Sequence, residues 1–268
     1  MPTSPLPDNG LSLLASPPVG QDALRLDLLP HAQKIAGTIG FIVNAVRPDG
    51  YFASCVLASY INGTKMSELV FRLLIRLARY IVSTRDLTLT LRSKAPSGSG
   101  MPQEGLDLFR GFVDSSHGNG PFGRSYGGFI LLCDGGGALA WKMAAPIAGD
   151  DSSGAAELRM GTLAYKYILA LRTLQTDLDV GVAPLSPTLL FSDAQAIIDG
   201  TGCERLKKSS RWMATRYAMI RWGLACKTIR LMKVPAFDNV ADIVTKCLTG
   251  TAFIRHRAAI LGLRPSPL

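Results

Sequence analysis

The feature that most constrains the fold is a change of sequence pattern near residues 94–105, a stretch rich in Ser, Gly and Pro. Before this stretch, apolar residues recur at helical spacing, so we expect helices at residues 31–43, 51–61 and 67–83. After it, short β-prone runs alternate with longer helical runs. We therefore interpret residues 94–105 as a linker and as the main domain boundary.

The second part of the chain has the pattern of an α/β domain. We expect strands at residues 108–114, 127–133, 138–142, 188–192 and 228–234. We expect helices at residues 152–175, from residue 194, and at residues 205–226 and 239–248. This order predicts a mixed five-stranded sheet flanked by helices, with an antiparallel meander first and parallel strands added through crossover helices. The predicted parts are a Pro-rich tail (1–30), a helical subdomain (31–93), the linker (94–105), the α/β domain (106–248) and a C-terminal extension (249–268).

Composition excludes several classes of protein. Apolar residues make up 47% and charged residues 18% of the 268 residues, which is enough to form a core. No apolar run approaches the ~18–20 residues of a membrane-spanning helix, and residues 1–20 lack the features of a signal peptide. The five cysteines are widely spaced and far from the three histidines, which argues against a zinc site or a disulfide framework. We expect an intracellular protein, cytoplasmic or nuclear rather than secreted.

Positive charge is concentrated in one segment. The net charge is +9, and residues 204–233 carry nine Lys or Arg against Glu204 alone. Three aromatic residues, Trp212, Tyr217 and Trp222, are interleaved with them. Clustered Lys and Arg bind nucleic-acid phosphates, although a solvated helix face with its aromatic residues packed inward would show the same pattern. The candidate nucleic-acid-binding residues are Lys207, Lys208, Arg211, Arg216 and Arg221.

Two aspartates stand at the ends of predicted strands. Asp114 shares a strand face with Phe112, and Asp193 shares one with Phe191, because side chains alternate along a strand. Both acids therefore follow an apolar residue that is expected to face the core.

Two further acids lie near the starts of predicted helices. Glu157 belongs to the apolar stripe of the long helix, and Asp242 is flanked by apolar residues. The stripe consists of Met160, Ala164, Ile168 and Leu171. A buried carboxylate is costly without compensation, and two divalent ions would supply it. Mg²⁺ fits these oxygen ligands, with Mn²⁺ as an alternative, but each acid could also be a helix cap or a turn residue.

Six segments of the second part resemble a known family in the right order. They are Gly111–Ser116 (similar to G-Y-x-D-A-D), Gly137–Lys142 (G-A-V-S-W-K), Ser152–Glu157 (S-S-T-E-A-E), Ser192–Ile197 (C-D-N-Q-S-A), Val240–Lys246 (L-A-D-I-F-T-K) and Arg257–Leu263 (K-L-R-A-K-L-G-L). These motifs resemble the C-terminal part of the Pol polyprotein of copia-type LTR retrotransposons, which ends in a ribonuclease H domain.

The helical block shares the resemblance, which covers roughly residues 31–263. Val46–Asp49 is similar to the T-R-P-D segment that precedes the ribonuclease H domain. Arg76–Ile81 with Thr84–Asp86 resembles R-V-L-R-Y-L-x-G-T-K-D. The block therefore looks like a reverse transcriptase connection region. The Y-x-D-D of the polymerase palm is absent from the sequence, so a polymerase subunit is a candidate partner.

The resemblance implies a ribonuclease H-like fold and a two-metal nuclease that cuts the RNA strand of an RNA–DNA hybrid. It assigns Asp114, Glu157, Asp193 and Asp242 as both catalytic and metal-binding residues. One departure concerns the basic helix, where K-H-I-D-x-R-Y-H-F reads as Arg211–Met219 without either histidine. A second hypothesis is therefore an inactive retroelement remnant that binds nucleic acid or has a structural role. A third is another nuclease or integrase on the same fold.

Overall fold

The computed structural model describes residues 2–15, 24–92, 108–116, 126–144, 153–178, 186–202 and 208–263. The predicted linker at 94–105 and the candidate Lys207 lie outside these ranges. None of the helices described is both long enough and apolar enough to span a membrane.

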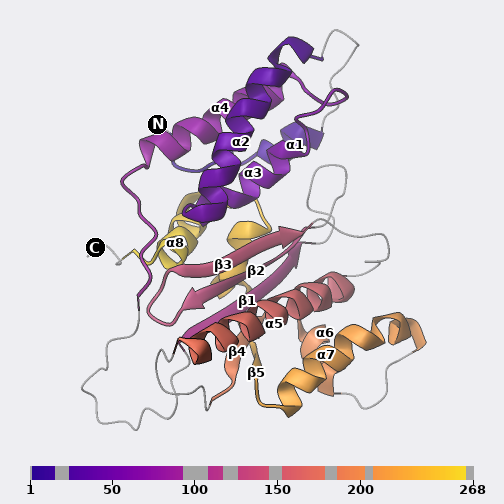
Figure 1. Ribbon diagram of the computed structural model, residues 1–268. Coiled ribbons are helices and arrows are strands. Elements are labelled where there is room, and N and C mark those ends of the chain that lie inside the picture. The colour runs from indigo at the N-terminus through magenta and orange to yellow at the C-terminus, as the bar shows by residue number, and fades with distance from the viewer. Residues whose placement is uncertain are drawn as a thin grey trace.

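A five-stranded sheet with the order β3-β2-β1-β4-β5 forms the centre of the molecule (Figure 1). Its strands are β1 (Phe109–Ser116), β2 (Tyr126–Cys133), β3 (Ala138–Ala144), β4 (Thr188–Ser192) and β5 (Ile229–Lys233). The first three form an antiparallel meander, whereas β4 pairs in parallel with β1 and β5 pairs in parallel with β4. This arrangement confirms the predicted mixed sheet and the ribonuclease H-like fold class.

One face of the sheet is covered by helices α5 (Ser153–Asp177) and α7 (Ala214–Ala225). The α5 residues Met160, Ala164 and Ile168 are fully buried, so the predicted apolar stripe does pack on the sheet. Helix α6 (Gln195–Gly202) follows β4, and a 3-10 segment, η5 (Lys208–Met213), precedes α7.

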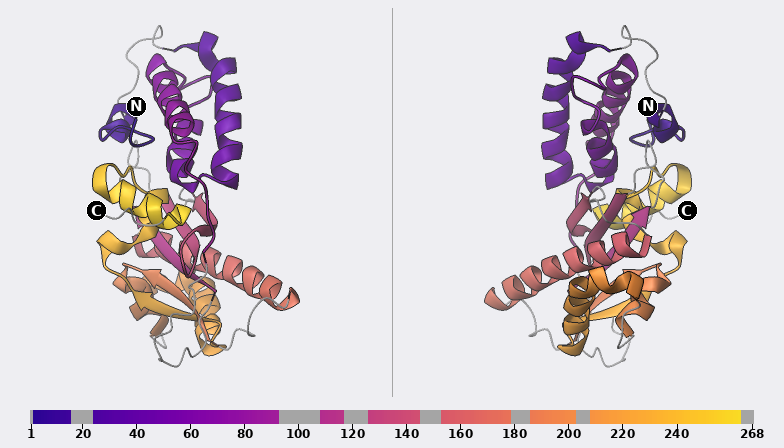
Figure 2. Two further views of the ribbon diagram at one scale, coloured as in Figure 1. Left: turned by 90° about the vertical axis from the view of Figure 1, so that its left-hand side faces the viewer. Right: turned by 90° about the vertical axis from the view of Figure 1, so that its right-hand side faces the viewer.

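The opposite face lies against the helical block. This block consists of α2 (Leu29–Ala45), α3 (Tyr51–Ala58) and α4 (Glu68–Ser83), with the short turns η2 (Leu26–Leu28) and η3 (Pro48–Gly50). Helix α4 begins where the Ser67 hydroxyl accepts a hydrogen bond from the Val70 amide. Figure 2 shows the block stacked above the sheet, with the C-terminal helix between them at one side.

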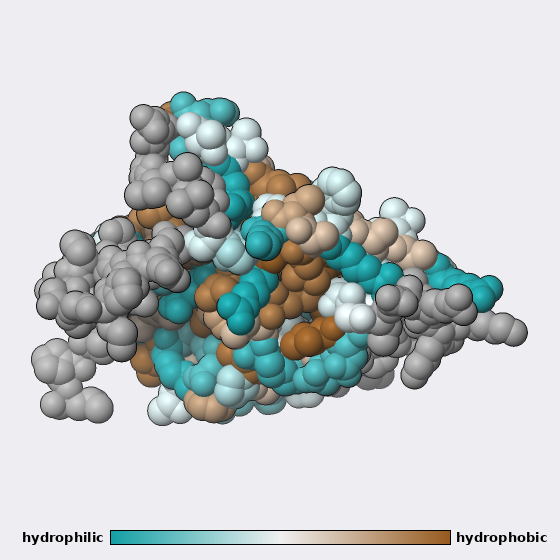
Figure 3. Space-filling view, turned by 90° about the horizontal axis from the view of Figure 1, so that it is seen from below, coloured by the Kyte–Doolittle hydropathy of each residue, from teal (hydrophilic) through white to brown (hydrophobic). Residues whose placement is uncertain are grey.

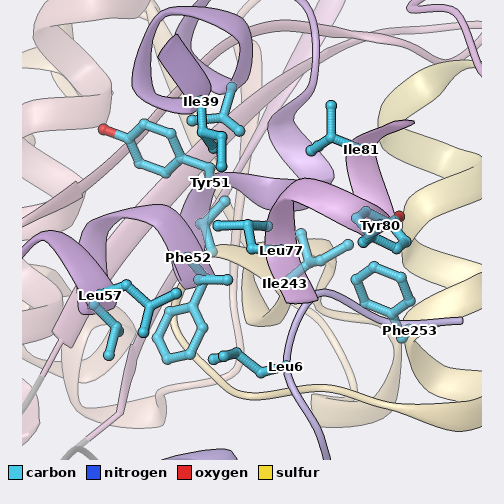
Figure 4. Close-up of a cluster of buried hydrophobic side chains, with 14 of the residues drawn as sticks. Leu6, Ile39, Tyr51, Phe52, Leu57, Leu77, Tyr80, Ile81, Ile243 and Phe253 are labelled. Atoms are coloured by element: carbon cyan, nitrogen blue, oxygen red, sulfur yellow. The ribbon is translucent and has the colours of Figure 1, made fainter. Parts of the chain in front are cut away.

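The helical block and the sheet share one apolar cluster. It joins block residues such as Phe52 and Leu77 to Phe112 and Ile130 of the sheet. Figure 4 shows Ile243 and Phe253 from the C-terminal region among the side chains of the block. Apolar burial of this kind stabilises by about 25 cal/mol per Å², so the shared cluster attaches the block to the sheet.

The N-terminal segment differs from the predicted tail. Residues 10–15 form a short helix, α1 (Gly10–Ala15), and both Leu6 and Leu14 are buried in the shared cluster. The prolines of this segment prevent a strand ladder, but they do not prevent two leucines from packing on the block.

The C-terminal region also differs from the prediction. Instead of one helix at 239–248, the chain forms two 3-10 turns, η6 (Ala236–Asp238) and η7 (Val240–Val244). A full helix, α8 (Gly250–Leu261), then lies in the predicted extension and ends at Gly262, which has a φ of 65°. The backbone of Thr249 is extended (φ −143°, ψ 176°), so no helix continues through it, and α8 is buried in the cluster that the block shares with the sheet.

Main-chain hydrogen bonds at residues 90–92 form a strap that joins the end of the block to α8 and to the turn between β2 and β3, where the Arg92 amide donates to the Gly136 carbonyl at 2.9 Å. The Thr90 amide donates to the Leu261 carbonyl at 2.9 Å, and the Gly137 amide donates to the Ala259 carbonyl at 3.0 Å. A Cβ on Gly137 or on Gly262 would collide with the Thr90 carbonyl, and both glycines have positive φ angles. Glycine is therefore required at both positions.

Candidate active site

Strand pairing brings Asp114 and Asp193 together. Phe112 and Phe191 are in register on the parallel strands β1 and β4, and their rings stack with centroids 5.0 Å apart. Asp114 and Asp193 each follow two residues later, so both acids stand on that face at the carboxyl ends of the strands. Asp114 is 2% exposed and Asp193 is half-buried.

A glycine opposite Asp114 allows η7 to approach the sheet. Gly128 is the β2 partner of Asp114, and a Cβ there would come within 2.8 Å of the side chains of Val244 and Thr245. Because position 128 has no side chain, η7 packs directly on the strands. Asp242 is thereby placed near Asp114.

Two residues after η7 hold Asp114 and Asp242 in place. The Lys246 ammonium lies 2.8 Å from Asp242 Oδ1 and 3.4 Å from Asp114 Oδ1. The Thr245 hydroxyl donates to Asp114 Oδ2. Sequence reasoning quoted this segment as part of a motif but gave neither residue a role. The spacing of Asp242 and Lys246, four residues apart, could have indicated their ion pair.

Asn239 is a second residue that sequence reasoning missed. Its side chain is fully buried and donates from Nδ2 to Asp193 Oδ1 at 3.2 Å and to the Val113 carbonyl at 2.9 Å. Its Oδ1 also accepts from the Ala241 amide at 3.3 Å, so it caps η7. One amide therefore ties Asp193 to β1 and to η7.

Glu157 reaches the same place from the other face of the sheet. A Cβ on Gly127 would collide with Met160, so this glycine lets α5 lie close to β2. Glu157 is 7% exposed, and its buried Oε2 has no hydrogen-bond partner among the residues that the structure describes. Burial, followed by repulsion from Asp193 and Asp114, raises the pKa of Glu157 to about 7.

The four acids act on one another electrostatically. Burial and the charge of Asp114 raise the pKa of Asp242 to about 6, and burial also raises the pKa of Asp114. Burial alone would lower the pKa of Lys246, but Asp114 and Asp242 raise it above its ordinary value. Asp114 and Asp242 thus pair directly with the Lys246 ammonium, and Asp193 and Glu157 interact with it electrostatically.

The ligand atoms of this site suit divalent cations, but their present arrangement does not form a metal-binding group. The donors are carboxylate oxygens, which Mg²⁺ prefers, and the unpartnered Glu157 oxygen marks negative charge that Lys246 does not neutralise. Within the described ranges, however, no three His, Cys, Asp or Glu side chains lie close enough together to hold a metal ion. Asp114, Asp193 and Asp242 are instead bonded to Lys246, Thr245 and Asn239.

The basic candidates have different environments. Arg211 is exposed, Arg216 lies over the Trp212 ring at 5.8 Å, and Lys208 lies in η5. Arg221 instead donates to the carbonyls of Gly200 (2.9 Å) and Thr201 (3.2 Å), in the last turn of α6. Arg221 therefore stabilises a helix end, which its sequence position did not indicate.

The interleaved aromatic residues are not all packed inward. Trp212 is 49% exposed and Trp222 is 68% exposed, whereas Tyr217 is buried. Seen from the end where β5 and α7 lie, the surface mixes hydrophilic and hydrophobic residues (Figure 3). Exposed tryptophans beside arginines offer flat surfaces as well as charge.

Comparisons with known proteins add likenesses of fold. No family model matches the chain, and no curated protein matches it. Among solved structures, the N-terminal RNase H domain of a Mycobacterium tuberculosis protein is 16% identical (TM-score 0.37) over 51% of this chain and 89% of its own. LC11-RNase H1, solved with an RNA/DNA hybrid, is 18% identical (TM-score 0.38) over 51% of this chain and 93% of its own. A foamy viral protease-reverse transcriptase, solved with double-stranded DNA, is 15% identical (TM-score 0.42) over 78% of this chain and 32% of its own.

Proposed function

We propose that this chain is a ribonuclease H of retroelement origin, derived from the C-terminal part of a copia-type Pol polyprotein. It hydrolyses the RNA strand of an RNA–DNA hybrid and leaves a 3′-hydroxyl and a 5′-phosphate. The observation that carries the proposal is the meeting of Asp114, Glu157, Asp193 and Asp242 at the carboxyl ends of β1 and β4. These acids are separated by up to 128 residues in sequence, yet they influence one another's pKa values.

All four acids supply oxygen ligands in the proposed reaction. Two bound Mg²⁺ or Mn²⁺ ions would activate the attacking water and stabilise the leaving oxygen. Asp114 and Asp242 supply the buried oxygens now paired with Lys246, and Asp193 supplies a half-buried one held by Asn239. Glu157 supplies a buried oxygen that accepts no hydrogen bond from any described residue.

The substrate-binding part of the proposal rests on the segment before and within α7. Arg211 and Arg216 contact phosphates, Lys207 and Lys208 extend the positive charge, and the exposed Trp212 and Trp222 pack on sugars or bases. Contacts to 2′-hydroxyl groups would distinguish the RNA strand.

The domain boundaries complete the proposal. Residues 31–93 form a connection subdomain, which positions the ribonuclease H-like domain of residues 106–248 relative to a polymerase subunit.

A labelled hybrid tests the proposal directly. The RNA strand is labelled, and cleavage is followed with Mg²⁺ and with EDTA for the wild type and for Asp193→Asn. The matched control is Asp199→Asn, because Asp199 is an exposed aspartate on the next helix, α6. We expect chelator-sensitive cleavage that is lost in Asp193→Asn and kept in Asp199→Asn. Tight hybrid binding without cleavage by the wild type would instead indicate an inactive nucleic-acid-binding remnant.

A further inference from the structure

The acid cluster already holds a cation of its own. The Lys246 ammonium forms ion pairs with Asp242 at 2.8 Å and with Asp114 at 3.4 Å. In the described part of the chain, no other Lys or Arg forms an ion pair with any of the four acids. Lys233 is nearby, but its ammonium donates to the main-chain carbonyl of Asp193 rather than to the carboxylate.

The position of Lys246 is fixed at its main chain and open at its side chain. The Lys246 amide donates to the Asp242 carbonyl at 2.8 Å, so the residue is held one turn after its acid partner. Its side chain is 30% exposed, whereas that of Asp114 is 2% exposed. The ammonium can therefore turn outward to water by rotation of a flexible side chain, while the carboxylates stay where they are.

We propose that Lys246 is a built-in competitor of divalent cations: it holds Asp114 and Asp242 in the metal-free protein and must withdraw when a metal ion binds. This inference rests on the proposed function. It explains why four acids meet without three of them forming a metal-binding group, since two of them are directed to the ammonium. One ammonium also balances only a quarter of the charge of four carboxylates, whereas two divalent ions balance all of it.

The proposal predicts two opposite effects of removing the ammonium. Without Lys246, the metal-free protein loses its compensating charge and becomes less stable. The same change frees oxygens of Asp114 and Asp242, so a divalent ion binds more tightly. A merely structural ion pair would give the first effect without the second.

The test uses Mn²⁺ alone, without nucleic acid. The wild type, Lys246→Met and Lys142→Met are freed of metal, and Mn²⁺ binding is measured by calorimetry and by electron paramagnetic resonance. Lys142 is an exposed lysine on β3 and serves as the matched control. We expect Lys246→Met to bind Mn²⁺ at least tenfold more tightly than the wild type, with a lower melting temperature before Mn²⁺ is added. Equal or weaker Mn²⁺ affinity, or no Mn²⁺ binding by either protein, would overturn the proposal.

A measurement on the wild type decides the question if Lys246→Met does not fold. The rate of acetylation of Lys246 is measured by mass spectrometry with and without Mn²⁺, and Lys142 is the internal reference. We expect Mn²⁺ to raise the Lys246 rate several-fold and to leave Lys142 unchanged. An unchanged Lys246 rate contradicts the proposal. Neither assay involves the hybrid. If Mn²⁺ displaces Lys246 but the protein does not cleave RNA, only the proposed function is refuted.

Discussion

Two buried charged clusters in this molecule are built on opposite plans. In the helical block, Arg47 and Asp49 are 4% and 2% exposed, and the guanidinium donates to both carboxylate oxygens at 2.9 and 2.7 Å. Tyr80 donates to the same carboxylate at 2.5 Å, and Arg47 also donates to the Thr84 carbonyl and hydroxyl. One positive charge meets one negative charge, and both oxygens of Asp49 are bonded.

The acid cluster at the sheet is unbalanced by comparison. Lys246 pairs with two of the four acids, and a buried oxygen of Glu157 has no hydrogen-bond partner in the described part of the chain. Such an arrangement lowers the stability of the metal-free protein, because like charges are held together away from water. The difference teaches that burial and charge alone do not mark a functional site. A functional site is distinguished instead by buried charge that the surrounding protein does not compensate.

The largest expected effect comes from breaking the balanced cluster. Arg47→Met should lower the free energy of unfolding by about 3–5 kcal/mol, because it leaves Asp49 charged and buried. Urea unfolding measures the loss. The control is Arg72→Met, which removes a surface pair with Glu68 (3.0 Å) and should cost less than about 1 kcal/mol. Equal losses in the two variants would refute the distinction.

At the unbalanced cluster, we expect a substitution to raise the free energy of unfolding instead of lowering it. Glu157→Gln should raise the free energy of unfolding of the metal-free protein at pH 8 by about 1–3 kcal/mol, because it removes a repelled carboxylate. The same variant should lose hybrid cleavage. Urea unfolding with EDTA present checks the first effect, with Asp199→Asn as the control. A destabilised Glu157→Gln would show that the carboxylate is compensated.

The pH dependence of that gain follows from the raised pKa. Between its ordinary value of 4.5 and about 7, Glu157 holds a proton in the folded chain and not in the unfolded chain. Its contribution therefore stabilises the fold at acidic pH and is lost as the pH rises through about 7. The advantage of Glu157→Gln should be present at pH 8 and absent near pH 4.5, and an advantage independent of pH would contradict this explanation.

The smallest effect concerns one hydrogen bond of the balanced cluster. Tyr80→Phe removes the hydroxyl that donates to Asp49, while Arg47 still pairs with both carboxylate oxygens. We expect a loss of about 1.5 kcal/mol. A double-mutant cycle with Arg47→Met measures the coupling between the two donors, and additivity of the two losses would show that the residues do not act as one network.

Local pattern was enough to predict much of this molecule. The bounds of β4 were predicted at residues 188–192, as the structure has them. The period of two placed Asp114 and Asp193 beyond the paired Phe112 and Phe191, and the helical period placed Glu157 on the buried stripe of α5. These predictions succeed because each depends only on neighbouring residues along one element.

The rest depends on contacts between distant segments. Helix α8 is buried by the block and the strap at Thr90, and Tyr80 meets Asp49 across 31 residues. The role of Asn239 is visible only in the fold, where its side chain donates to the Val113 carbonyl and to Asp193. Arg221 was counted as surface charge, but its environment is the end of α6. No periodicity within one element contains this information.

The apolar cluster shared by the block and the sheet has a consequence for dissecting the molecule. Together with η7 and α8, the block covers the face of the sheet opposite α5, and Phe112, Ile130 and Leu132 belong to the cluster that they share. A fragment that starts at residue 106 would present these side chains to water and would aggregate. Removing residues 1–105 would therefore make the rest of the chain insoluble, although Asp114, Glu157, Asp193 and Asp242 would all still be present.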